Sequence, residues 1–156
     1  MADSPDAMRK VGGGGAHALP GEPALMRRWE RANTRLASQH RQLEAFFTVV
    51  TEELPGNSVA SVRRAFSRLD DAFTAHLAIE EHVYLATLRR LYPDDSEVLR
   101  GLVEEHHAFR RRFERLHRIL GRGLLEPFAS AFKRLAADFL RHERREAEIV
   151  SALRRL

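Results

Sequence analysis

Residues 128–153 of this 156-residue chain read FASAFKRLAADFLRHERREAEIVSAL. Apolar side chains recur in this stretch at steps of four and three, the period of one face of an α-helix. The stripe consists of Phe128, Phe132, Leu135, Phe139, Ile149 and Leu153. The same steps, continued through the gap after Phe139, arrive at His142 and Glu146. Two ionisable residues therefore occupy positions that should face a core.

Two other segments carry a stripe that passes through a single histidine. The stripe of residues 24–54 passes through His40, and that of residues 96–120 passes through His106. The residue four positions after His106 is Arg110, so this histidine has no acidic partner at that spacing. His107 remains an alternative to its neighbour, but it lies one step off the stripe, so we prefer His106.

The segment 58–91 completes the set, because its stripe leads to His76 and Glu80 before Val83 resumes it. Its histidine and glutamate are four residues apart and share one helix face. The second half of the chain overlays the first with an offset of 66 residues. The matched pairs include His40 with His106, Phe66 with Phe132, His76 with His142 and Glu80 with Glu146.

Proline and glycine divide the chain into four helical segments, because both residues end helices. The breaks lie at residues 55–57, 92–96 and 121–123, and the connections are short. Short connections favour antiparallel neighbours, so we predict an all-α, up-down-up-down four-helix bundle over residues 23–156. Residues 1–22 contain a glycine run and clustered prolines, and we predict a disordered N-terminal tail there.

Six ionisable residues on four buried stripes require a partner that compensates for their burial. A metal cluster would supply one, and the chain contains no cysteine, so its ligands must be nitrogen and oxygen atoms. The predicted ligands are His40, His76, Glu80, His106, His142 and Glu146. The alternatives are a metal-free network of self-paired polar groups and a ferritin-like site. A ferritin-like site needs Glu-x-x-His on two helices, and the two matches, Glu104–His107 and Glu114–His117, both lie within the single segment 96–120.

Charge and hydropathy indicate no nucleic-acid or membrane partner. The formal net charge is +4, and the arginine runs alternate with glutamates, as on a solvated helix face. No apolar run approaches the ~20 residues that span a bilayer, and the N-terminus lacks an apolar signal region. We therefore expect a cytoplasmic protein, and a monomer, because the apolar stripes are used internally.

These residues resemble the hemerythrin-like, or HHE cation-binding, domain family over residues 24–156. The pattern is His40, then His76-Leu-Ala-Ile-Glu80, then His106, then His142-Glu-Arg-Arg-Glu146. The resemblance implies a non-haem di-iron centre, in which Glu80 and Glu146 bridge two iron ions and the histidines are terminal ligands. Classical oxygen carriers of the family have a second histidine where this chain has Arg110, and an aspartate at the fifth position after the last histidine.

The resemblance implies a protein that binds or turns over a small oxidant such as peroxide, O2 or NO, in oxidative-stress or iron handling. With two histidines per iron, the site is expected to be symmetric and open at both metals. The enzymatic version is catalase-like, and the alternative is a non-enzymatic carrier or a redox sensor acting through a partner. Glu81, Glu104 and Glu105 are candidates to hydrogen-bond ligand histidines, although a solvated position is the expectation for each.

Overall fold

The computed structural model describes residues 21–155 and is entirely helical within that range, with no strand. The elements are α1 (Glu22–Glu53), α2 (Val59–Ile79), a π-helical turn η1 (Glu80–Tyr84), α3 (Leu85–Leu91), a short 3-10 helix η2 (Pro93–Asp95), α4 (Ser96–Gly121) and α5 (Leu125–Leu153). Since α2, η1 and α3 follow one another without a break, residues 21–155 form four long helical rods. All but the last two residues of the expected N-terminal tail lie outside the described part.

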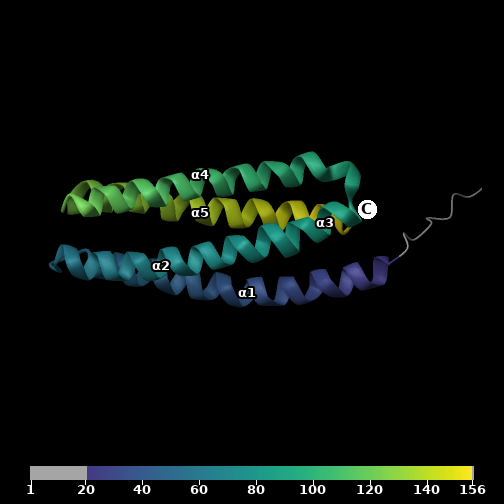
Figure 1. Ribbon diagram of the computed structural model, residues 1–156, viewed down its shortest axis with the longest axis horizontal. Helices are drawn as coiled ribbons and strands as arrows, with labels where there is room; N and C mark the ends of the chain where they lie inside the picture. The colour runs from purple at the N-terminus through teal and green to yellow at the C-terminus, as the bar shows by residue number, and fades with distance from the viewer. Residues whose placement is uncertain (1–20, 156) are drawn as a thin grey trace, which may run out of the picture.

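The four rods lie side by side along one axis (Figure 1). The α1–α2 turn and the α4–α5 turn lie at one end, and the α3–α4 connection lies at the other end near the C-terminus. This arrangement is consistent with the expected bundle. No helix within residues 21–155 combines the length and the apolar composition needed to cross a membrane.

The turns between helices follow local backbone chemistry. Ser58 begins α2 as its N-cap, and its side chain accepts a hydrogen bond from the backbone N–H of Ser61. After α4, Gly123 adopts a positive φ of 74°, which lets Leu124 donate its N–H back to the carbonyl of Ile119. Ser58 thus fixes the start of α2, and the turn at Gly123 ends α4 before α5 begins.

Two hydrophobic cores fill the bundle. The turn-side core contains Phe66, Phe73, Phe109, Phe113, Phe128, Phe132 and Phe139 with aliphatic neighbours. The terminal-side core contains Trp29, Ala32, Leu36, Tyr84, Leu85, Leu88, Leu99, Leu102, Val150 and Leu153. On α5, the positions between Phe139 of the first core and Val150 of the second are those of His142 and Glu146. The ionisable residues thus form a polar layer between two apolar ones.

In the second rod, the π turn changes which residues after Glu80 face the core, so the expected stripe is wrong there. Leu85 donates its N–H to the carbonyl of Glu80, five residues earlier, so this turn holds one residue more than an α-helical turn. The core therefore receives Tyr84, Leu85 and Leu88, while Val83 is only half-buried. A smaller difference occurs on α5, where Val150 is buried and the expected Ile149 is half-buried.

Candidate metal centre

Five of the six predicted ligands are buried in the polar layer. His76, Glu80 and His106 have no exposed surface, and His142 and Glu146 are 3% and 5% exposed. The sixth predicted ligand, His40 on α1, has 32% of its side chain exposed. The four rods each contribute at least one of these residues, as the interrupted stripes predict.

One group of donor atoms lies between α4, α5 and the start of the π turn. The Nε2 atoms of His106 and His142 are 3.1 Å apart, and a carboxylate oxygen of Glu80 lies 3.5 Å from His106 Nε2. Ligand atoms of these three residues all lie within 4.8 Å of one another. This group has the spacing of donors around a single metal ion.

A second group lies between α1, α2 and α5, and it includes a residue that the sequence analysis missed. His40 Nε2 lies 2.8 Å from Oε2 of Glu143, and His76 Nε2 lies 3.6 Å from Oε1 of the same carboxylate. His40, His76 and Glu143 form a second candidate metal-binding triad. Glu143 directly follows His142 and is one step off the stripe, so the periodicity that identified the other residues excluded it.

Glu80 and Glu146 connect the two groups. Glu80 places one oxygen 3.1 Å from His76 Nε2 and the other 3.5 Å from His106 Nε2. Glu146 belongs to a third cluster of possible ligands, together with His142 and Glu143. Both carboxylates therefore stand where a bridge between two metal ions would stand.

In the first group, a carboxylate contacts the Nδ1 atom of each imidazole, on the opposite side of the ring from the candidate ligand atom Nε2. Glu81 lies 2.9 Å from His106 Nδ1, and Arg110 lies 2.9 Å from the same Glu81 oxygen. A carboxylate on Nδ1 keeps the proton there and leaves Nε2 free to bind a metal. Arg110 is thus linked to the first group of donor atoms through Glu81.

Glu105 has the same relation to His142. One of its oxygens lies 2.7 Å from His142 Nδ1, and the other pairs with Arg145. Glu81 and Glu105 were expected to be solvated, and the structure shows otherwise. Glu104 is exposed beside Arg100, as expected.

The remaining histidines of the described chain lie outside the cluster. His107 is exposed next to Arg110, so the structure places His106 rather than its neighbour among the candidate ligands. His82 is exposed and contacts the carbonyl of Ala78. His117 pairs with Asp70 at 2.7 Å.

The protein environment alters the pKa values of the clustered groups in opposite directions. Burial would raise the pKa of Glu80, but the adjacent His106 and His76 hold it well below its ordinary value. Burial and the charge of Glu80 raise the pKa of Glu146 well above its ordinary value. The two carboxylates thus favour sharing one proton.

The pKa values of two of the histidines are also shifted in opposite directions. Burial would lower the pKa of His76, but the nearby Glu143 and Glu80 carboxylates raise it to about 9. Burial, together with the neighbouring His106, lowers the pKa of His142 to about 4. The neutral imidazole of His142 is the form that binds a metal, whereas His76 must first lose a proton.

The residues of the cluster fit a metal centre better than a self-paired network. Within the described chain, several buried atoms lie within ion-pair distance of one another but make no hydrogen bond of ordinary geometry; they include His40 Nε2, His76 Nε2, both oxygens of Glu80, Glu143 Oε1 and Glu146 Oε2. A self-paired network would have satisfied these atoms, since each unpaired buried polar group is costly. Imidazole nitrogens and carboxylate oxygens that face one another unpaired are a donor set for a divalent or trivalent cation.

The comparisons with known proteins agree with the cluster. No curated protein and no solved structure matches the chain. A family model described as the hemerythrin HHE cation binding domain matches residues 31–153, which includes all seven residues of the cluster. The chain therefore belongs to the hemerythrin family of HHE cation-binding domains.

Proposed function

We propose that the chain is a non-haem di-iron protein that binds or turns over a small oxidant. The observation that carries the proposal is the pair of adjacent donor groups, one with His40, His76 and Glu143 and the other with Glu80, His106 and His142. Glu80 and Glu146 would bridge the two metal positions. Two histidines and a carboxylate are a set that non-haem iron favours, and the absence of thiolate in the sequence agrees with iron.

Two bound iron ions would supply reversible one-electron chemistry and Lewis acidity toward a small oxidant such as peroxide, O2 or NO. The chain's own residues make that chemistry selective. Phe73, Phe109 and Phe139 pack against the histidines with ring centroids 5.4–6.5 Å apart, and they exclude bulk water from that side. A dry layer strengthens each electrostatic contact within it.

The catalase-like version of this function is an enzyme, and the other version is a carrier or sensor without turnover. Membership of a cation-binding family supports the bound metal that both versions require. The proposed oxidant is peroxide, O2 or NO, and the proposed biological role is in oxidative-stress or iron handling.

The first test is metal content together with the ultraviolet–visible spectrum of protein from iron-supplemented cells. We expect about two irons per chain and a charge-transfer band near the edge of the ultraviolet. His106→Ala should lose iron, and His107→Ala, one position away and exposed, is the matched control. Protein that contains no iron, and binds none on anaerobic reconstitution with ferrous iron, would contradict the proposal.

Peroxide then separates the two versions. Oxygen evolution on an oxygen electrode, repeated over many equivalents of peroxide, indicates an enzyme. A stable spectral change after one equivalent, with no oxygen released, indicates a binding protein.

A further inference from the structure

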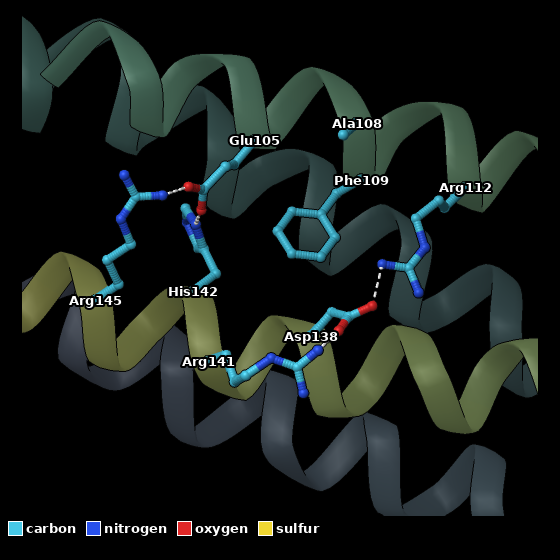
Figure 2. Close-up of a pocket in the computed structure, with 8 residues that line it drawn as sticks. All are labelled: Glu105, Ala108, Phe109, Arg112, Asp138, Arg141, His142 and Arg145. Carbon is cyan, nitrogen blue, oxygen red and sulfur yellow. Dashed lines mark hydrogen bonds and ion pairs between the residues drawn. The ribbon is translucent and has the colours of Figure 1, made fainter. Parts of the chain in front are cut away.

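A pocket of about 330 Å³ opens between α4 and α5 on the side of the centre that holds His142 (Figure 2). His142 and Phe109 line this pocket, and so does Ala108, whose small side chain leaves space open there. His142 is only 3% exposed, so the pocket reaches the edge of the polar layer without opening it to bulk solvent. The pocket therefore ends at a candidate metal ligand.

Arginines surround this pocket. Arg145 pairs with Glu105, while Arg112 and Arg141 share Asp138, as Figure 2 shows. Three guanidinium groups thus face two carboxylates around the pocket. Each guanidinium carries five N–H donors, and these pairs leave several of them free for an anion. The pocket is suited to a small anion more than to a neutral or cationic ligand.

Two larger hollows lie on the opposite side, between α1 and α5. They measure about 510 and 490 Å³, and both are lined by His40 and Ala147. Glu143 also lines the second hollow. Size alone would make this side the entrance, because His40 is the most exposed of the candidate ligands.

Donor counting points to the other side. If two carboxylates and one solvent-derived group bridged the metals, His40, His76 and Glu143 would bring the metal on their side to about six donors, the usual maximum for iron. His106 and His142 would bring the other metal to about five donors, which leaves one position open. The ligand set expected from the sequence lacks Glu143 and is symmetric, whereas this residue makes the two positions unequal.

We propose, resting on the di-iron function above, that a small exogenous anion binds at the His106–His142 position and enters through the α4–α5 pocket. Glu143 acts as a terminal ligand that closes the His40–His76 position. The arginines around the pocket attract the anion, and Phe109 limits its size. Azide, a linear monoanion, is a suitable probe because its binding to di-iron centres is followed by absorption.

Two alanine variants test the route, since each adds the same bulk on a different side. Ala108→Phe fills the α4–α5 pocket and should slow azide association about tenfold or more in stopped-flow measurements. Ala147→Phe fills the α1–α5 hollows and should change the rate less than about twofold. The reverse order, equal slowing, or no slowing in either variant overturns the proposal.

A charge pair keeps the test decisive if Ala108→Phe fails to fold. Arg141→Gln removes a cation from the α4–α5 pocket, and Arg144→Gln removes one from the α1–α5 side. Only Arg141→Gln should lower the azide association rate and weaken its dependence on ionic strength. Equal effects of the two substitutions contradict the assigned entrance.

The role of Glu143 has its own readout, the number of azide ions bound per chain. The unmodified protein should bind one, and Glu143→Ala should bind two, because the second metal gains an open position. An unchanged stoichiometry in a variant that still holds two irons refutes the ligand role. Unmodified protein that binds no iron would instead contradict the proposed function, so the two failures are distinguishable.

Discussion

Replacing Glu105 by glutamine tests whether the carboxylate behind His142 tunes the metal site. Glu105 lies 2.7 Å from His142 Nδ1, and the substitution keeps its shape while removing its charge. Losing such a partner typically weakens metal binding by ten- to a hundredfold, or about 1.4 to 2.7 kcal/mol. Arg145 loses its ion-pair partner too, but its side chain is 55% exposed and that loss costs little.

The expected result is a loss confined to one of the two metals. The assay is anaerobic competition of ferrous iron against a chromophoric chelator, which resolves two binding steps when their affinities differ. Glu105 contacts His142 and does not belong to the group of His40, His76 and Glu143, so the second step should retain its affinity.

Glu104→Gln is the matched control, because it makes the same chemical change one residue away on an exposed side chain. We expect its two binding steps to match those of the unmodified protein. Equal weakening by both substitutions would refute the reasoning, and so would unchanged binding in Glu105→Gln.

Four further results are expected. Phe66→Ala removes a fully buried ring from the turn-side core and should cost about 3–5 kcal/mol in thermal unfolding while leaving metal content intact; Val49→Ala, exposed, should cost almost nothing. In the metal-free protein, the raised pKa of His76 contributes stability that is complete below its unfolded value of 6.5 and is lost as the pH rises through about 9, a fall of about 3 kcal/mol in denaturant titrations across that window. Metal binding at pH 7 should release protons from His76 and from Glu146, whose pKa is raised, so calorimetric enthalpies should depend on the ionisation enthalpy of the buffer. Deleting the exposed residue His82 should turn the π turn into a regular α-helical turn, with helix content retained and metal affinity reduced.

The fold could be predicted because its signals are local and repeat four times. The steps of four and three held along α4 and α5 as far as Glu146, and proline or glycine lay at each break. The same periodicity separated His106 from His107, since adjacent residues on a helix point about 100° apart. The structure confirms that separation, with His106 buried and His107 exposed.

The rest of the site depends on contacts between helices, which periodicity within one helix does not reveal. Glu143 lies off its own stripe and reaches the cluster only because His40 and His76 approach it from α1 and α2. Glu81 and Glu105 also lie at stripe edges, where a carboxylate is usually solvated. The partner of Glu81 is His106 on α4, and the partner of Glu105 is His142 on α5.

The π turn has a consequence for the history of the chain. Up to Glu80 the two halves correspond with an offset of 66 residues, but the buried Leu85 and Leu88 correspond to Val150 and Leu153 with an offset of 65. A single inserted codon accounts for this change, because α5 passes the equivalent point without a wide turn. If the two halves descend from one duplicated hairpin, that insertion followed the duplication. An alignment of the halves that allows no gap after Glu80 would therefore mispair every later core residue.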